Sequence, residues 1–312
     1  MAVYIAPAAM GLGDLVVALP VVQSAIAHGE KVYLVIRLKE HLPLAQRISG
    51  LSGVILEWQL DPTRLKTNDV FYDLRDHYLQ KRYWWGSRQF IQAYPGYKIN
   101  DILSIICSDL GLEVDFDKLT ILQYNKRSEV RNSVLFIPGS AIDAKCWSHD
   151  AWLKLADQLQ SQGTAVGVIG EPENSWAVSE LLTAGLHHHA TPTIADALDL
   201  LSSCRAVVSV DTGLMHLAVH QSIPTVGIFR RDPVYVRNFP NFQSVITPKQ
   251  CSDACYQREA QSFHHHRPLA GPHFRPANWS CQTVDGGHCL SSISAASVME
   301  ALEQVLNVGT PV

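Results

Sequence analysis

The sequence predicts an α/β protein of two domains, each built around a parallel β-sheet. The 312-residue chain exceeds the usual size of one compact core. Short apolar strands alternate with helical stretches in its first half. After a polar run at residues 125–132 the same alternation starts again. We therefore expect an N-terminal domain over residues 1–128 and a C-terminal domain over residues 129–312.

In the first domain we expect strands at residues 2–7, 31–37, 54–58, 69–74 and 119–124, and helices at 15–27, 40–48 and 97–110. A loop with Gly11 and Gly13 joins the first strand to the first helix, at the edge where α/β proteins bind ligands. Asp14 is thus placed for chemistry, although Asp is also a favoured helix cap. As an ordinary carboxylic acid it is expected to be ionised at pH 7.

Cations alternate with aromatic residues after the strand at 69–74. Aromatic rings stack on the apolar faces of sugars, and guanidinium groups form paired hydrogen bonds with anions. This pattern favours contact with a saccharide or phosphate-bearing acceptor, although an exposed amphipathic segment would have the same composition. The candidate acceptor-side residues are Arg75, Arg82, Trp84 and Arg88.

In the second domain we expect strands at residues 134–137, 165–169, 206–210 and 225–229, and helices at 150–162, after 173, at 194–203, from 214 and at 294–306. The carboxyl ends of parallel strands meet at one edge of a sheet, so the turns that follow three of these strands are expected to form one pocket. The candidate residues in and after these turns are Gly139, Ser140, Lys145, Glu171, Asp211, Thr212, Gly213, Leu214, Met215 and His216.

The chemistry of these residues suits a nucleoside diphosphate. Gly213 lets a ligand approach the backbone, and the free amides at the start of the next helix favour an anion. Lys145 and His216 add donors for phosphate, and a carboxylate can accept hydrogen bonds from ribose hydroxyls. An ordinary helix-start turn with a structural histidine remains the alternative.

Four of the seven cysteines gather near the end of the chain, with five histidines among them. They are Cys251, Cys255, Cys281 and Cys289. Four thiolates can hold Zn or Fe in tetrahedral geometry, so a structural metal is one candidate. Free thiols and disulfides are the other two, and a cytoplasmic chain disfavours disulfides.

The composition of the chain limits the kinds of partner that it is expected to bind and its expected location in the cell. A net charge of -4 argues against nucleic acid and against strong attraction to acidic membranes. No stretch approaches the roughly 20 apolar residues of a membrane span, and no basic leader precedes the first strand. We expect a cytoplasmic protein, with at most a peripheral contact at the inner face of the membrane.

Four motifs resemble those of glycosyltransferase family 9, the bacterial heptosyltransferases of lipopolysaccharide synthesis. They are GLGDLVVALP at residues 11–20, FIPGSAIDAKCW at 136–147, GEPE at 170–173 and VDTGLMHLA at 210–218. The resemblance implies a GT-B fold, in which two Rossmann-like domains with parallel sheets face a central cleft. It also implies inverting transfer from a nucleotide sugar, typically ADP-heptose, to a saccharide of lipopolysaccharide or a related glycan, whether lipid-linked or protein-linked.

The resemblance assigns roles to individual residues. Asp14 matches the general base, and Gly13 lies in the same matching loop. Lys145, Asp211, Thr212, Gly213 and His216 match the residues that hold the donor, and no cofactor is required for the chemistry. The Lys-Trp-Pro of the family reads Lys145-Cys146-Trp147-Ser148 here, which loosens the local match.

Two other functions remain open on the sequence alone. One is a GT-B-fold nucleotide-sugar epimerase, whose paired domains would give the same pattern. The other is a non-catalytic sugar-nucleotide-binding protein that uses the Cys/His-rich tail as an interaction module. The Gly13-Asp14 and Asp211-Thr212-Gly213 blocks favour the transferase over the epimerase, and donor turnover by the wild type and by Asp14→Ala would separate catalysis from binding alone.

Overall fold

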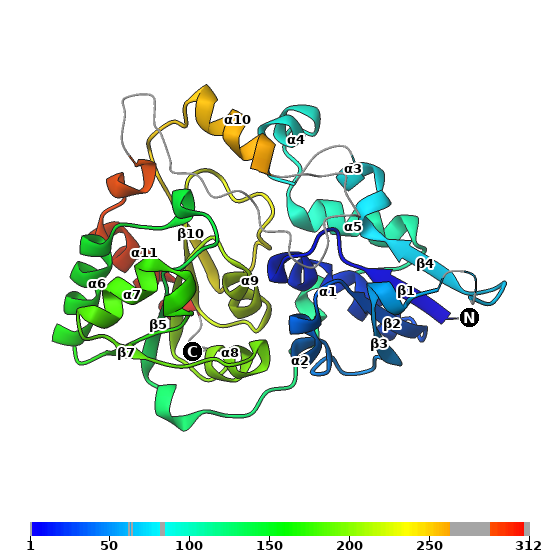
Figure 1. Ribbon diagram of the computed structural model, residues 1–312, viewed down its shortest axis with the longest axis horizontal. Coiled ribbons are helices and arrows are strands. Elements are labelled where there is room, and N and C mark those ends of the chain that lie inside the picture. The colour runs from blue at the N-terminus through cyan, green and yellow to red at the C-terminus, as the bar shows by residue number, and fades with distance from the viewer. Residues whose placement is uncertain (1, 62, 64, 82–84, 263–287, 309–312) are drawn as a thin grey trace.

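The computed structural model describes residues 2–61, 63, 65–81, 85–262 and 288–308. The chain forms two lobes, each with a parallel β-sheet and surrounding helices (Figure 1). The predicted α/β class is therefore confirmed. All strands of the first sheet precede the polar run 125–132, and all strands of the second follow it. The domain boundary at residues 128 and 129 stays a prediction.

The first sheet has four strands in the order β3-β2-β1-β4, all parallel. Its strands are β1 (Ala2–Ala6), β2 (Lys31–Ile36), β3 (Gly53–Leu56) and β4 (Val70–Asp73). The helices of this lobe are α1 (Leu12–Ala27), α2 (Leu42–Ala45), α3 (Tyr78–Lys81), α4 (Arg88–Ala93) and α5 (Ile99–Asp109). Because β1 is a central strand, the loop that follows it opens in the middle of the carboxyl edge of the sheet.

The second sheet has six parallel strands in the order β10-β9-β8-β5-β6-β7. Its strands are β5 (Ser133–Ile137), β6 (Ala165–Val168), β7 (His187–His188), β8 (Ala206–Val210), β9 (Thr225–Phe229) and β10 (Phe242–Ile246). Its helices are α6 (His149–Ser161), α7 (Trp176–Thr183), α8 (Ile194–Leu201), α9 (Gly213–His220), α10 (Asp253–Ser262) and α11 (Ala295–Val308).

The central strands of this second sheet are apolar because helices cover both of its faces. Every residue of β5, β8 and β9 is buried, which is the usual pattern of a parallel sheet between helix layers. Helix α11 packs against β9 and β10, and α1 of the first lobe packs against α9 of the second. The carboxyl ends of β5, β8 and β9 thus lie on rigid, buried strands beside the first lobe.

Most predicted elements are confirmed, but the predicted strand at 119–124 is wrong. That segment is irregular and extended. Its backbone pairs with a side chain instead of a strand, since Gln221 accepts from the Leu122 amide at 2.8 Å and donates to its carbonyl at 3.2 Å. The predicted helix at 40–48 is shorter, and β7, β10, α3, α4 and α10 were not predicted.

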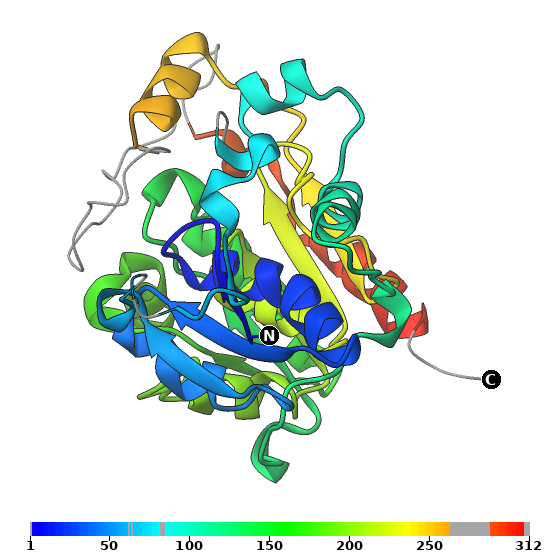
Figure 2. The ribbon, with the colours of Figure 1, turned by 90° about the vertical axis from the view of Figure 1, so that its right-hand side faces the viewer.

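Helices α4 and α10 lie at the same end of the molecule in two perpendicular views, although they belong to different lobes (Figures 1 and 2). They are joined by an ion pair between Arg88 and Asp253 at 2.8 Å. No helix among the described residues is long and apolar enough to cross a membrane.

Candidate active site

Asp14 lies in the first turn of α1, at the carboxyl edge of the first sheet. Gly11 is the N-cap residue, so Asp14 is not the cap itself but the third residue of the helix. Its Oδ2 accepts a hydrogen bond from the Gly11 amide at 3.0 Å, which satisfies one of the free amides at the helix start. Asp14 therefore stabilises the helix start and is held in a fixed position.

Burial raises the pKa of Asp14 to about 7. The Gly11 hydrogen bond and the charges of Arg37 and Lys145 act in the opposite direction. The expectation of an ordinary, fully ionised carboxylate is wrong, because near neutral pH the group is divided between its two forms. An acid with a pKa near the working pH is well suited to proton transfer.

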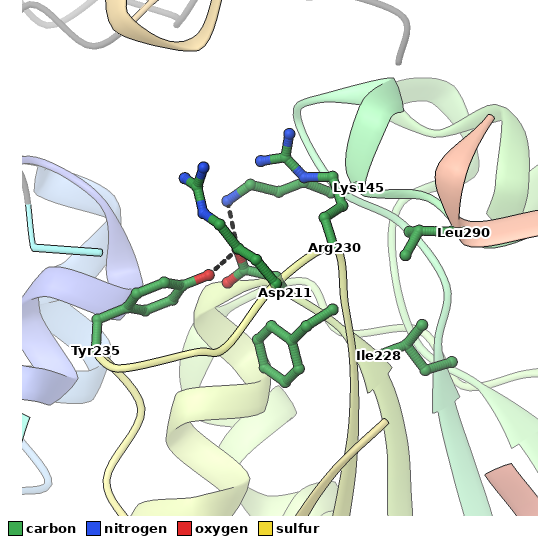
Figure 3. A pocket seen from close by; sticks show the side chains of 8 residues that line it. Lys145, Asp211, Ile228, Arg230, Tyr235 and Leu290 are labelled. Atoms are coloured by element: carbon green, nitrogen blue, oxygen red, sulfur yellow. Dashed lines mark hydrogen bonds and ion pairs between the residues drawn. The ribbon is translucent and has the colours of Figure 1, made fainter. Parts of the chain in front are cut away.

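Lys145 and Asp211 meet at the carboxyl edge of the second sheet (Figure 3). The Lys145 ammonium lies 2.7 Å from Asp211 Oδ2, and the Tyr235 hydroxyl donates to the same oxygen at 2.7 Å. Burial alone would raise the pKa of Asp211, but the Lys145 charge and these hydrogen bonds outweigh it and lower the pKa to about 2. Asp211 is thus ionised, and Tyr235 is kept neutral because burial raises its pKa well above the ordinary value.

This pair lines a pocket with residues that the sequence did not single out. The pocket is lined by Lys145, Asp211, Ile228, Phe229, Arg230, Arg231, Tyr235 and Leu290. Arg230 and Arg231 directly follow β9, so they occupy the carboxyl end of a fourth strand. The sequence signal for these two residues is a pair of consecutive arginines directly after an apolar strand.

The starts of α1 and α9 touch each other between the lobes. A Cβ atom on Gly213 would lie 2.6 Å from Leu12 Cβ and 2.8 Å from the Gly13 amide nitrogen. We expected Gly213 to let a ligand come close to the backbone. In the structure, the start of α1 lies against Gly213 instead. Two helix N-termini, each with a partial positive charge, therefore face the same space.

His216 also lies at this contact. It is buried beside Gly13, and burial lowers its pKa to about 4, so the ring is neutral at physiological pH. A neutral imidazole can still donate one hydrogen bond to a phosphate. Thr212 and Leu214 are half-buried neighbours in the same turn, whereas Met215 is fully buried in a hydrophobic cluster with Phe229.

The other predicted donor residues have local structural partners. A Cβ on Gly139 would lie 2.6 Å from Ser175 Oγ, so this glycine allows close packing against the start of α7. Ser140 accepts from the Ile142 amide at 3.4 Å. Glu171 is exposed and accepts from Asn174. None of these three predicted residues lines the described pocket.

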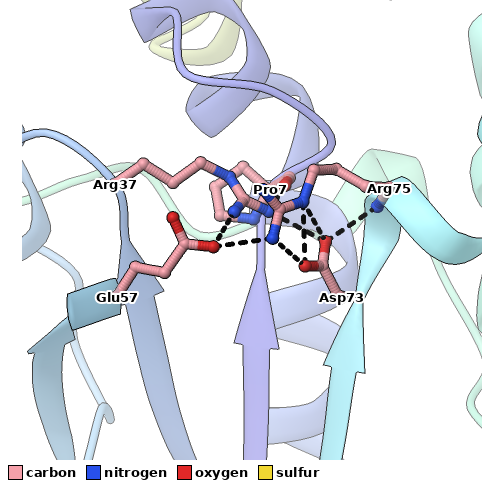
Figure 4. Close-up of polar contacts among 5 residues, drawn as sticks. All are labelled: Pro7, Arg37, Glu57, Asp73 and Arg75. Carbon is pink, nitrogen blue, oxygen red and sulfur yellow. Dashed lines mark hydrogen bonds and ion pairs between the residues drawn. The ribbon is translucent and has the colours of Figure 1, made fainter. Parts of the chain in front are cut away.

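Charged side chains form a network at the carboxyl edge of the first sheet (Figure 4). Arg37 is buried, donates to the Pro7 carbonyl at 2.7 Å and to Asp73 at 2.8 Å, and also pairs with Glu57. Arg75 pairs with Asp73 and lies 2.6 Å from Glu57. The two arginines are therefore balanced by two carboxylates, and the predicted acceptor residue Arg75 is held in place by them.

The remaining acceptor-side predictions fall in two groups. Arg88 is half exposed, pairs with Asp253 and lies 4.9 Å from the centroid of the Tyr256 ring, so it joins the lobes. Arg82 and Trp84 lie outside the described residues.

Comparison with known proteins identifies the family. The family model described as glycosyltransferase family 9 (heptosyltransferase) matches residues 107–263, about half of the chain. The chain belongs to glycosyltransferase family 9. Among curated relatives, lipooligosaccharide heptosyltransferase 2 of Haemophilus influenzae is 34% identical over 122 residues, which cover 35% of each chain. Lipopolysaccharide heptosyltransferase 2 of Escherichia coli is 33% identical over 119 residues, covering 35% of this chain and 34% of the relative.

These matches span about a third of the length of the curated relatives. Solved structures match over nearly the whole chain. The E. coli heptosyltransferase WaaC with ADP gives a TM-score of 0.65 at 16% identity, covering 98% of this chain and all of that one. The iron-containing dodecameric glycosyltransferase TibC of enterotoxigenic E. coli gives 0.60 at 18% identity, covering 99% of this chain and 77% of that one. This likeness confirms the GT-B fold that the family resemblance implied.

Three of the four tail cysteines of this family 9 chain lie together. Cys255 and Cys289 are buried, and the half-buried Cys251 interacts with both. Hydrogen bonding with Cys255 raises the pKa of the Cys251 thiol, and the Cys289 thiol acts in the opposite direction. Cys281 lies outside the described residues. Among the described residues, no group of three or more His, Cys, Asp or Glu side chains is placed so that it could hold a metal ion.

Proposed function

We propose that this chain is an inverting glycosyltransferase that moves heptose from ADP-heptose to a saccharide of lipopolysaccharide or a related glycan. One observation carries the proposal. The carboxyl group of Asp14, on the first lobe, lies within electrostatic reach of Lys145, which belongs to the pocket of the second lobe. A base on one side and a cationic pocket on the other are what inversion at an anomeric carbon requires. Membership of family 9 supports the same reaction.

In this mechanism Asp14 removes the proton from the acceptor hydroxyl. The acceptor oxygen forms a bond to the anomeric carbon on the face opposite the diphosphate, and the carbon–oxygen bond to the diphosphate breaks. The bonding electron pair leaves on the nucleoside diphosphate. Lys145 and the starts of α1 and α9 stabilise the negative charge that develops there.

Donor contact is assigned by this proposal to residues of both lobes. Gly13, Thr212, Gly213 and Leu214 present backbone near the two helix starts, His216 supplies a neutral donor, and Lys145 and Asp211 lie in the pocket. Gly139, Ser140 and Glu171, at the ends of β5 and β6, remain candidates for the nucleoside, and Met215 supports the turn from behind. The acceptor enters from the first lobe, where Arg75 and Arg88 are exposed in part. In this proposal the reaction takes place in the cytoplasm.

The test is turnover with a panel of nucleotide sugars and saccharide acceptors. The purified protein should bind ADP-heptose in preference to ADP-glucose, UDP-glucose and GDP-mannose, and should release ADP when a heptose acceptor is added. Lys145→Ala should weaken donor binding by about tenfold or more, the usual effect of a lost charge-assisted phosphate contact. Conversion of the nucleotide sugar into an epimer without transfer would instead favour the epimerase, and binding without either reaction would favour a binding protein.

We further propose that the tail cysteines Cys251, Cys255, Cys281 and Cys289 hold one structural Zn or Fe. Support comes from the contact of the Cys251 thiol with Cys255 and Cys289, because clustered thiols are good ligands for both metals. The similar fold of a glycosyltransferase described as iron-containing is consistent with this proposal. Bound metal would fasten α10 to the segment that precedes α11, and would have no part in the transfer step.

Elemental analysis of protein purified without chelator should then give about one Zn or Fe per chain. Cys255→Ser should lose most of that metal and melt at a lower temperature, because metal binding contributes directly to folding. Cys204→Ser, at a buried cysteine outside the cluster, should keep the metal. Metal-free protein with the melting temperature of the wild type would contradict the proposal.

A further inference from the structure

Arg37 is a buried cation at the same edge of the first sheet as Asp14. It directly follows β2, and only 4% of the residue is exposed. Its guanidinium donates to Asp73 at 2.8 Å and also pairs with Glu57. Arg75 shares both carboxylates, and Figure 4 shows the two guanidinium groups between them. Burial strongly disfavours an isolated charge, so these partners fix the position of Arg37.

A third contact of Arg37 reaches the loop that leads to Asp14. Its Nη2 donates to the Pro7 carbonyl at 2.7 Å, and Pro7 is the first residue after β1. The loop runs from there to Gly11, whose amide donates to Asp14 Oδ2 at 3.0 Å. Both ends of the loop are thus held by hydrogen bonds, one from the buried arginine and one to the carboxylate. Such support keeps a reactive side chain in one place.

The charge of Arg37 also acts on Asp14. Burial raises the pKa of Asp14 to about 7, whereas the Gly11 hydrogen bond, Arg37 and Lys145 lower it. Of these two charges, that of Arg37 has the larger effect. A nearby positive charge favours the ionised carboxylate, which is the form that accepts a proton. Arg37 therefore opposes the effect of burial on this group.

Among the described residues, the helices packed against α1 add no buried charge to this balance. Helix α9 brings His216 and His220, and burial lowers the pKa of both, so both rings are neutral at physiological pH. The buried side chains of α5 are apolar apart from Cys107, and burial raises the pKa of that thiol to about 11. Within the described part of the first lobe, Arg37 is thus the cation that acts on Asp14.

We propose that Arg37 is a positioning residue for Asp14, which holds the loop between β1 and α1 through Pro7 and favours the proton-accepting form of the carboxyl group. The inference rests on the proposed function, because it takes Asp14 to be the base of the transfer. Arg37 is not among the residues that line the pocket of the second lobe. Its removal should therefore slow proton transfer and leave donor binding unchanged.

The pH dependence of turnover separates this role from a purely structural one. Arg37→Gln should move the midpoint of the profile upward by about 0.5 to 1 pH unit, because the carboxylate loses a stabilising charge. Turnover at pH 6 should fall about three- to tenfold as a result, with a change in donor KM of less than about twofold. Arg37→Lys keeps the charge but not the planar fork, so it should restore the midpoint and only part of the plateau rate.

The titration of the Asp14 carboxyl can also be measured without any substrate. NMR of the full chain with isotope-labelled aspartate would follow the carboxyl carbons, and Asp14→Asn would assign the signal by its loss. The midpoint of this signal should move upward in Arg37→Gln, as the midpoint of turnover does.

Glu57→Gln provides a test of opposite sign, which holds even if Arg37→Gln fails to fold. The Glu57 side chain is 32% exposed, and glutamine can still accept from Arg37. The loss of its charge leaves Arg37 less compensated, so both midpoints should move downward, by about 0.3 to 0.5 pH unit.

Arg47→Gln is the matched control, since Arg47 is another arginine of the first lobe that pairs with a carboxylate, Asp199 at 3.5 Å. Its midpoints should be those of the wild type. A purely structural role of Arg37 would lower plateau rates and leave every midpoint in place, and that result would overturn the inference. Movement of the midpoints in the same direction in Arg37→Gln and Glu57→Gln would overturn it too.

The two kinds of measurement separate this inference from the proposed function. If the two variants move the NMR midpoint in opposite directions while no nucleotide sugar is turned over, the role of Arg37 holds and the transferase is wrong. If ADP-heptose is turned over in an Asp14-dependent way and neither variant moves a midpoint, the function holds and the inference is wrong. Unmoved NMR midpoints in a protein that turns over no nucleotide sugar would overturn both.

Discussion

Asp14→Asn is expected to bind donor nearly as well as the wild type and to turn over about a hundredfold more slowly, or worse. The substitution preserves size and an oxygen that can accept from the Gly11 amide, so the start of α1 should keep its shape. It removes the group that takes the acceptor proton. Steady-state turnover with ADP-heptose and a verified acceptor, together with nucleotide binding by calorimetry, would measure both effects.

The pH dependence of the wild type follows from the same carboxyl group. Only the ionised form can accept the proton, and burial raises the pKa of Asp14 to about 7. Turnover should therefore rise with pH through 7, and at pH 6 should be about a tenth of its plateau value. A base with an ordinary carboxyl pKa would give a rate independent of pH over this range.

Asp14 should also cost stability at alkaline pH. Its pKa in the folded chain, about 7, lies above the reference value of 3.8, so the folded state binds more protons between these values. The stabilisation is complete below pH 3.8 and is lost as pH rises through 7. Asp14→Asn lacks a titrating group, and we expect it to be more stable than the wild type at pH 8 by about 1 to 3 kcal/mol and similar to it near pH 4.

Asp101→Asn is the matched control for both measurements. Asp101 occupies the third position of α5 and accepts from the Lys98 amide at 3.0 Å, as Asp14 does from Gly11, but it is exposed. The control should keep wild-type turnover and should not gain stability at pH 8. Wild-type turnover in Asp14→Asn would mean that Asp14 only completes the helix start, and the base would have to lie elsewhere in the first lobe.

The sequence predicted the strands and turns of this site better than it predicted the segments that surround them. Residues 206–210 and 225–229 are β-branched runs between turn residues, and such local patterns specify buried strands wherever they lie. Residues 119–124 have a similar composition, yet they cross between the lobes and pair with Gln221. That partner is 99 positions away, so no local pattern could have revealed it.

Local sequence patterns also predict only part of the chemistry of the site. The sequence predicted that Lys145 and Asp211 lie in one pocket, because the carboxyl ends of parallel strands meet at one edge, but it did not predict that they pair. The raised pKa of Asp14 depends instead on burial, and a short motif contains no information about burial. Arg230 and Arg231 were missed because consecutive charged residues usually indicate an exposed loop.

The sequence analysis correctly expected that position 213 needs glycine, but the physical reason differs from the one expected. Glycine there was expected to admit a ligand, and the structure shows that it admits the backbone of α1. The nearest atoms to an added Cβ would be Leu12 Cβ at 2.6 Å and the Gly13 amide nitrogen at 2.8 Å. The Gly13 nitrogen belongs to the backbone and Leu12 Cβ is bonded directly to it through Cα, so neither atom can rotate away as the far end of a side chain could. An alanine must therefore push α1 and α9 apart.

Gly213→Ala is expected to lower turnover on the order of a hundredfold, because displacement of the base from the donor by about 1 Å has an effect of that size. Overpacking of this contact should also lower the free energy of unfolding by about 1 to 3 kcal/mol. Gly13→Ala meets the edge of the His216 ring at 3.1 Å instead of backbone, so its effects should be smaller in both measurements. Gly185→Ala, at a positive φ of 93° with open space around it, should reduce stability alone. The contact between the two helix starts would have no part in catalysis if Gly213→Ala lost stability but kept wild-type turnover.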